Sequence, residues 1–179
     1  MKIKPEKQKV FTIILFAVYM LLLTGVILFK LPFYSAKLSD GIRVINLIPF
    51  QGSFDENGVL VLREIMQNTL LFIPLGVYIC MLKSKWTFWK KLLPIIGLTF
   101  AFEILQFIFA LGRSDITDIL DNILGGLIGI AVYALLFKIF KSKTDKILLI
   151  FAVILTVCVV ARFSQLFYMS HFGMRHLRQ

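Results

Sequence analysis

The sequence contains few of the residues that build disulfide frameworks, zinc sites or hydrolytic triads. It has 2 cysteines and 2 histidines among 179 residues. Cys80 and Cys158 each lie inside an apolar run, where a thiol is usually a small packed hydrophobic group rather than half of a disulfide. His171 and His176 both lie in the C-terminal tail. The sequence therefore indicates neither a zinc site nor a Ser-His-Asp arrangement.

Charged residues are also scarce. They make up 17% of the chain, against 59% hydrophobic residues, and the mean hydropathy is +0.86. This composition excludes an ordinary soluble domain and predicts a polytopic membrane protein. The net charge of +10 does not indicate nucleic-acid binding, because most lysines flank apolar segments, where they contact lipid headgroups and set topology.

Five apolar stretches are long enough to cross a bilayer, which takes about 20 helical residues. All five are expected to be helices, because lipid offers no other partner for the backbone polar groups. We therefore predict one all-α membrane domain over residues 1–179, with an external loop at 30–63. The expected spans are about 10–29, 65–82, 92–111, 116–140 and 147–169.

The distribution of basic residues predicts the orientation. Lysines cluster before the first span, between the second and third, and between the fourth and fifth. Since lysine-rich segments stay in the cytoplasm, the N-terminus is expected inside and the C-terminus outside. Only Glu6 and Asp145 among the acids then fall on the inner side, so polar chemistry is expected to face outward.

Polar side chains fall in the outer half of three spans. Helical rise places Asn68 about 6 Å inward from the start of its span, and Glu103 roughly 12 Å beneath the outer end of the next. Glu103 shares a helix face with Gln106, and Asp118 shares one with Asn122. Each uncompensated polar group in lipid costs a few kcal/mol, so these side chains are predicted to share one hydrated pocket.

Simpler structural roles stay open for several of these residues. Asp115 and Asp118 also suit the first turn of a helix, where acids are favourable. Asn68 and Gln106 suit hydrogen bonds between helices. Asp121 points about 100 degrees away from its neighbour on the helix, so we expect a solvated or interfacial charge and leave it out of the site.

Two further features have structural interpretations. Arg162 either pairs with Glu103 or Asp118, or extends its side chain to the headgroups, as a lone arginine near a span end commonly does. Gly125 and Gly129 form a GxxxG pattern that favours close helix packing.

Four motifs, taken together and in order, resemble the VanZ-like family of bacterial membrane proteins. They are "NLIPF" (46–50), "NTLLFIPLG" (68–76), "LTFAFEILQFIFALG" (98–112) and "DITDILDNILGGLIG" (115–129). The resemblance implies a multi-pass protein of the bacterial cytoplasmic membrane that lowers susceptibility to the lipoglycopeptide teicoplanin without remodelling peptidoglycan precursors. The polar positions that match the family motifs are Asn46, Asn68, Glu103, Gln106, Asp115, Asp118 and Asn122.

Two kinds of function fit these observations, and the sequence does not decide whether the protein is an enzyme. In the first, the pocket binds or modifies an amphiphilic cell-envelope molecule, with Glu103 and Asp118 as candidate acid and base. The expected substrate-binding residues are Asn46, Asn68, Gln106, Asp115 and Asn122.

The alternative is a non-catalytic binding or scaffold protein for a lipid-linked wall precursor, the antibiotic itself or a partner membrane protein. Expected partners are therefore the lipid bilayer and an amphiphilic or lipid-linked molecule, with teicoplanin as one candidate and no nucleic acid. Carboxylates and amide oxygens are also ligands that Mg²⁺ or Ca²⁺ accepts, so a divalent cation stays open. Transport is disfavoured, because no inverted repeat is visible.

Overall fold

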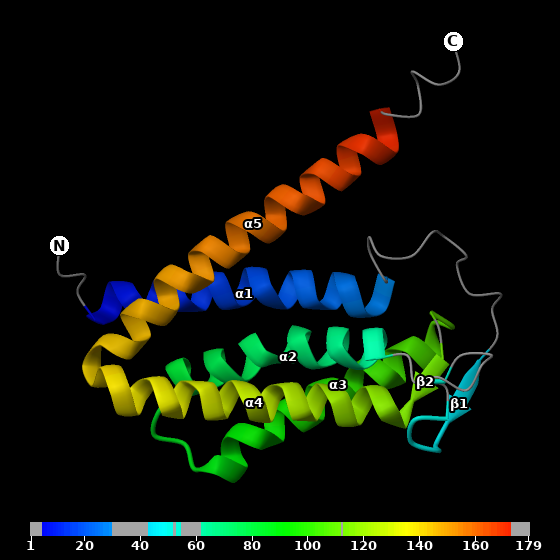
Figure 1. Cartoon of the computed structure of the whole chain (residues 1–179), viewed down its shortest axis with the longest axis horizontal. Helices are drawn as coiled ribbons and strands as arrows, with labels where there is room; N and C mark the ends of the chain where they lie inside the picture. The colour runs from blue at the N-terminus through cyan, green and yellow to red at the C-terminus, as the bar shows by residue number, and fades with distance from the viewer. Residues whose placement is uncertain (1–4, 30–42, 52, 55–61, 112, 173–179) are drawn as a thin grey trace.

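The structure, a computed structural model, consists almost entirely of helices (Figure 1) and describes residues 5–29, 43–51, 53–54, 62–111 and 113–172. This confirms the predicted all-α class in its broad form. Most of the expected loop at 30–63 lies outside the described residues. The helices are α1 (Pro5–Phe29), α2 (Leu62–Leu82), α3 (Phe88–Ile108), α4 (Ile116–Phe140) and α5 (Thr144–Phe172), with the short 3-10 helix η1 (Lys141–Lys143) between the last two.

Within the described residues, four helical stretches are long and apolar enough to cross a membrane: Glu6–Leu28, Leu62–Leu82, Phe88–Ile108 and Ile116–Gln165. The protein is therefore a multi-pass membrane protein. The fourth stretch has 50 residues and contains α4, η1 and most of α5. A straight helix of that length would measure about 75 Å, far more than the hydrocarbon core of a bilayer needs. Instead the chain reverses direction at η1 (Figure 1).

A small parallel sheet was not expected from the sequence. It pairs β1 (Val44–Asn46) with β2 (Arg113–Asp115), so that Asn46 lies opposite Asp115. The turn that follows α3 makes this possible, because Ala110 adopts a φ of 50° and ends the helix. Arg43 donates hydrogen bonds to the carbonyls of Phe107 and Ile108 at the C-terminal end of α3, where a cation is favourable.

Glycines bring α2 and α4 into direct backbone contact. A Cβ at Gly125 would overlap the carbonyl oxygen of Thr69, and one at Gly129 would overlap that of Ile73. From the other helix, a Cβ at Gly76 would overlap the carbonyl oxygen of Gly126. The GxxxG interpretation is therefore confirmed, since only residues without a side chain allow this approach.

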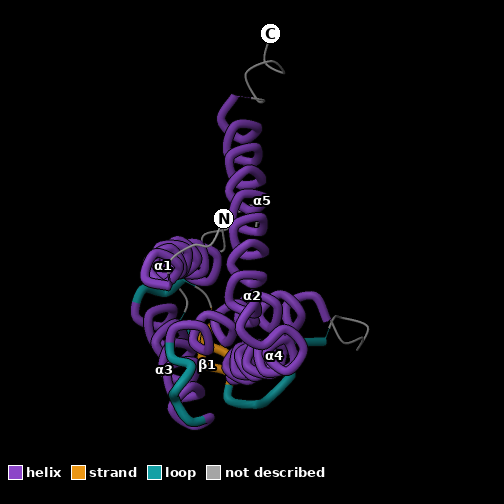
Figure 2. Tube along the Cα trace, turned by 90° about the vertical axis from the view of Figure 1, so that its left-hand side faces the viewer, coloured by secondary structure: helices purple, strands orange, loops and turns teal. Residues whose placement is uncertain are grey.

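The helices α1 and α5 pack less closely against the bundle. Leu23 and Ile27 of α1 join the main apolar core with Phe72 and Ile95. Among the described side chains of α5, the buried ones lie near its start, at Thr144, Leu148 and Leu149. Figure 2 shows the rest of α5 leaving the bundle toward the C-terminus. The remaining apolar surface of α5 is thus available to lipid.

Three single residues of the sequence analysis can now be placed. Both cysteines are free thiols, and Cys80 is buried as expected for a packed group, whereas Cys158 is exposed on the apolar surface of α5. Arg162 is exposed on α5 and donates to the side chain of Gln165 one turn away. Its contact therefore lies on its own helix rather than at the acids of α3 and α4.

Candidate functional site

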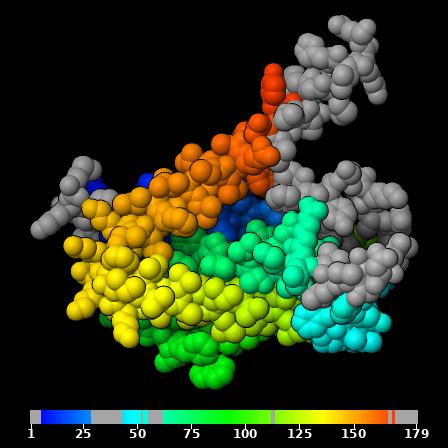
Figure 3. All heavy atoms as spheres, in the orientation of Figure 1, coloured from blue at the N-terminus to red at the C-terminus, as the bar shows by residue number. Residues whose placement is uncertain are grey.

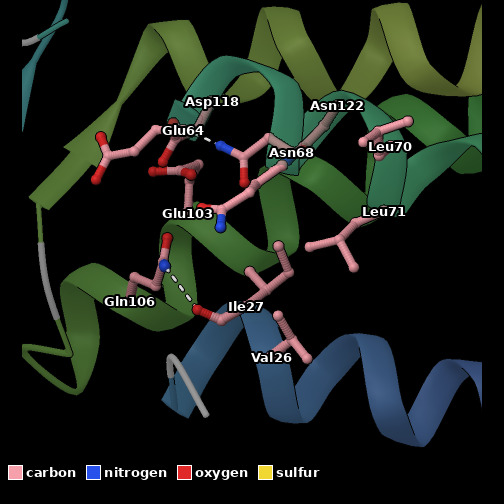
Figure 4. A pocket seen from close by; sticks show the side chains of 11 residues that line it. Val26, Ile27, Glu64, Asn68, Leu70, Leu71, Glu103, Gln106, Asp118 and Asn122 are labelled. Carbon is pink, nitrogen blue, oxygen red and sulfur yellow. Dashed lines mark hydrogen bonds between the residues drawn. The ribbon is translucent and has the colours of Figure 1, made fainter. Parts of the chain in front are cut away.

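A polar pocket of about 250 Å³ lies between α1, α2, α3 and α4. It brings together five of the predicted site residues, from three different helices. Figure 4 shows their carboxylate and amide groups gathered on one side, with Val26, Leu70 and Leu71 on the other. The five are Asn68, Glu103, Gln106, Asp118 and Asn122.

Hydrogen bonds fix the amide side chains of the pocket. Asn68 donates from Nδ2 to Oδ1 of Asp118 over 2.8 Å, which joins α2 to α4. Asn122 donates from Nδ2 to the hydroxyl oxygen of Thr99 over 2.8 Å, which joins α4 to α3. Each of these bonds has the interhelical role that amides commonly have in membrane bundles.

Gln106 connects the pocket to α1. Its Nε2 donates to the backbone carbonyl of Ile27 over 3.1 Å, and the side chain is 3% exposed. The interhelical role considered for Gln106 is therefore present in the structure. Its Oε1 has no hydrogen-bond partner among the described residues.

Residues that follow α3 in the chain donate hydrogen bonds to Glu103. Its carboxylate accepts from the backbone N–H of Asp115 over 2.9 Å, and its backbone carbonyl accepts from the Ser114 hydroxyl. Glu103 is 6% exposed, so burial and these bonds restrict its position. Glu103 is thus oriented by residues of β2 in the small sheet.

Asn46 and Asp115 do not line the pocket. Asp115 is the N-cap of α4 and accepts from the N–H of Thr117, while its other oxygen accepts from Nδ2 of Asn46. The structure therefore places these two beside the described lining of the pocket. Asn46 binds the side chain of Asp115, and the backbone N–H of Asp115 binds Glu103. The capping role considered for Asp115 is the one observed.

Asp121 corrects the sequence analysis. It was expected to be solvated or interfacial, but it is 4% exposed, and its Oδ2 has no hydrogen-bond partner among the described residues. The buried part of α4 is wider than one stripe, since it also includes Thr117, Ile119 and Asn122. A helix enclosed by neighbours on several sides buries residues that a simple angular rule assigns to the surface.

Two pocket residues were not selected from the sequence as part of the site. Glu64 and Gln67 line the pocket from the first turns of α2. Thr99, which is fully buried, holds Asn122 from outside the pocket lining. The spacing offered a signal, because Glu64 precedes Asn68 by four residues and Thr99 precedes Glu103 by four, which puts each on its neighbour's face.

The charged side chains in the described lining of the pocket are all acids. Glu64, Glu103 and Asp118 contribute carboxylates, whereas no lysine, arginine or histidine occurs among the described lining residues. The described residues also contain no group of three or more His, Cys, Asp or Glu side chains that could hold a metal ion. The polar side chains of the described lining are therefore acids and amides.

An apolar cavity of about 620 Å³ adjoins the polar pocket. Val26, Leu70 and Leu71 line both, and the larger cavity continues between α1, α2, α4 and α5. Figure 3 shows the surface hollowed between α4 and α5 on this side. The volume falls within the range of about 300–1,000 Å³ that is typical of ligand pockets.

Comparison with known proteins identifies the family. The VanZ/LLP1 family profile matches residues 16–141, which include every residue that lines the polar pocket. Protein VanZ of Enterococcus faecium is 33% identical over 150 residues, covering 82% of this chain and 88% of that protein. No solved structure matches the chain. The resemblance seen in the four motifs is thus confirmed, and the chain belongs to the VanZ/LLP1 family.

Proposed function

We propose that this protein lowers the susceptibility of a bacterium to teicoplanin by binding the head of an amphiphilic cell-envelope molecule in the polar pocket. The family supports the resistance role. The observation that carries the binding role is the pocket itself, in which polar groups from α2, α3 and α4 meet beside an apolar cavity. A polar pocket next to an apolar one suits a molecule with a head and a chain.

The proposal includes an orientation in the bacterial cytoplasmic membrane. The start of α1, the α2–α3 turn and the α4–α5 turn all lie at one end of the bundle (Figure 1), and each is rich in lysine. Lysine-rich ends stay in the cytoplasm. With α4 and α5 crossing separately, the chain spans the bilayer five times, and the polar pocket opens toward the outer leaflet.

Acid–base chemistry on the bound molecule is the second candidate function. It is favoured by one observation, the presence of Glu103 and Asp118 in the same pocket. Two carboxylates in a poorly solvated site can differ in proton affinity, as general acids and bases require. Catalysis and binding differ in what they demand of Glu103, because only catalysis needs a group that exchanges a proton.

The resistance role is tested by expression in a teicoplanin-susceptible bacterium. The wild-type protein is expected to raise the inhibitory concentration of teicoplanin and to leave that of vancomycin unchanged. Glu103→Leu, which removes the polar group from the pocket, is expected to abolish protection. Glu6→Gln is the matched control, since Glu6 is exposed at the opposite end of α1. Equal protection by wild type and empty vector at normal protein level would refute the role.

Glu103→Gln then separates binding from catalysis. It keeps the shape of the side chain and one acceptor oxygen, so a binding pocket retains part of its protection, with Glu64 and Asp118 still charged. An acid–base enzyme loses all of it. Immunoblots of membrane fractions provide the protein level against which each variant is compared.

A further inference from the structure

We propose that the polar pocket and the apolar cavity together bind a membrane lipid whose head is uncharged and carries hydroxyl groups. One of these hydroxyl groups donates a hydrogen bond to the amide oxygen of Gln106. This assignment rests on the proposed binding function and names the class of ligand. It follows from the acceptors that the protein leaves unpaired, from the donors in the same pocket and from the continuity of the two cavities.

Two amide oxygens in the pocket lack a hydrogen-bond partner. Oε1 of Gln106 and Oδ1 of Asn122 are buried, and neither accepts a hydrogen bond from the described residues. Both side chains line the pocket, and they are 3% and 2% exposed. A buried polar atom without a partner costs free energy, which a ligand that donates hydrogen bonds recovers.

The orientation of Gln106 is determined by its partner. The carbonyl of Ile27 can only accept a hydrogen bond, so the amide nitrogen must face α1 and the amide oxygen must face away from it. Figure 4 shows this oxygen on the Glu103 side of the residue. Thr99, the partner of Asn122, can donate as well as accept, so Gln106 is the better defined of the two acceptors.

Donors in the same pocket favour a hydroxyl group on the ligand. Asn68 uses one hydrogen of its amide nitrogen for Asp118, and the nitrogen carries a second. A hydroxyl group donates one hydrogen bond and accepts up to two, and its hydrogen rotates toward an available acceptor. It can therefore use acceptors such as Gln106 and donors such as Asn68, whereas an ammonium group only donates.

An uncharged head also suits the position of the pocket. The pocket lies among membrane-spanning helices, where burying a charge costs far more than burying a hydroxyl group that finds a partner. Glu103 and Asp118 do not decide the class, because both accept hydrogen bonds from within the protein. The unpaired oxygen of Gln106 does, since it requires a donor of any charge and burial favours a neutral one.

The apolar cavity accounts for the rest of the ligand. Its described lining contains no charged side chain, and it meets the polar pocket at Val26, Leu70 and Leu71. The lining residues on α5 extend from Ile147 to Phe163, which is about 24 Å of helix, whereas one lipid chain fills only half of the roughly 30 Å hydrocarbon core. The two cavities together therefore suit a lipid better than a small soluble polyol.

The test uses the purified full chain in phosphatidylcholine nanodiscs and three uncharged photoreactive probes. All three are glycerol ethers with the same saturated chain, which carries a diazirine near its methyl end. The first probe keeps both free hydroxyl groups, the second has methyl ethers in their place, and the third has fluorine atoms. The methyl ethers keep the acceptor oxygens and fluorine keeps the approximate size, so the probes differ chiefly in their ability to donate.

Intact mass spectrometry measures the labelled fraction, and peptide mapping locates the label. The hydroxyl probe is expected to label residues of the apolar cavity at a concentration roughly tenfold below that of either comparison probe. Glycerol without a chain is expected not to compete, which distinguishes a lipid from a soluble polyol. Equal labelling by the three probes, no labelling of the cavity, or competition by glycerol would overturn the inference.

Variants connect the selectivity to the named acceptor. Gln106→Leu is expected to remove most of the preference for the hydroxyl probe, whereas Gln8→Leu, the same change near the start of α1, is expected to keep it. The preference is read as a ratio between probes, because loss of the bond to Ile27 would weaken labelling by all three alike. Unchanged preference in correctly folded Gln106→Leu protein would contradict the proposal, and the wild-type ratio tests it even where that variant does not fold.

A second variant tests the continuity of the two cavities. Val159→Trp fills the apolar cavity and leaves the polar pocket intact, so it is expected to reduce labelling by all three probes to a similar extent. Undiminished labelling in this variant would place the chain elsewhere and contradict the joint site.

The outcome can be separated from that of the resistance assay, because no antibiotic is present. Selective labelling without teicoplanin protection would refute the resistance role and leave the lipid site standing. Protection without selective labelling would refute the lipid class alone.

Discussion

The two sides of this bundle are built differently. On one side α2 and α4 touch through their backbones, with glycines at each point of closest approach. On the other side α1 and α5 leave a cavity of about 620 Å³ next to α2 and α4. The close side positions Asn68 and Asp118 to within a hydrogen bond of each other, and the open side provides room for a chain. The α2–α4 pair thus fixes the polar side chains, whereas α1 and α5 leave space for a ligand chain.

The largest effect is expected where the backbones touch. Gly129→Ala places a Cβ on the carbonyl oxygen of Ile73, so α2 and α4 must separate, at a cost of about 3 kcal/mol. Gly97→Ala on α3 is the matched control, because a Cβ there meets nothing within 4 Å. The free energy of unfolding in mixed detergent micelles provides the measurement. Equal stability of the two variants would show that the close contact is absent in the membrane protein.

The second effect concerns the support behind the pocket. Asp115→Ala removes the N-cap of α4 and leaves the Asn46 amide without its partner, so a loss of about 2 kcal/mol is expected. Asn46→Ala is expected to cost about 1 kcal/mol. Measured together with the double variant, the two losses should not add, because the residues share one hydrogen bond. Simple additivity would argue against the side-chain contact between β1 and β2.

A smaller effect is expected from the hydrogen bond between α3 and α4. Thr99→Val keeps the volume of the side chain but leaves the buried amide nitrogen of Asn122 unpaired, at a cost of about 1.5 kcal/mol. Thr24→Val is the control, since the Thr24 hydroxyl donates to the carbonyl of Met20 in its own helix. A comparable loss in both variants would mean that the bond between the helices contributes nothing specific.

The smallest effect is expected on the open side. The Tyr19 hydroxyl donates to the carbonyl of Leu71 over 2.7 Å and connects α1 to α2 beside the apolar cavity. Tyr19→Phe keeps the ring and its packing, so a loss of about 0.5 kcal/mol is expected in the same unfolding assay. A loss larger than that of Thr99→Val would reverse the contrast between the two sides.

Much of the architecture was predictable from local pattern. The run at 116–140 coincides with α4, and the other four stretches fall largely within helices, because hydropathy alone decides which segments partition into lipid. The third stretch was placed too far along, at 92–111, whereas α3 covers Phe88–Ile108. The apolar residues after Ile108 continue the pattern, but the backbone turns at Ala110. Hydropathy does not report such a turn.

The pocket was partly predictable for the same reason. Asn68, Glu103 and Asp118 were grouped by depth, which follows from the helical rise, and all three line one cavity. However, the depth of a residue in the membrane does not say how its helix is rotated relative to the neighbouring helices. Asp121 was therefore placed at the surface although it is buried, and Asn46 and Asp115 were grouped with the pocket residues although neither belongs to the described lining.

The sequence by itself determined that the protein resides in a membrane, which segments are helical, and that acids and amides share one level, because these properties depend on transfer free energy and helical geometry. Only the tertiary structure decided which oxygens are left unpaired, how Glu103 is held by the chain after α3, and where the apolar cavity lies. These features depend on how helices distant in sequence pack together, and that packing is set by backbone contacts such as those between α2 and α4.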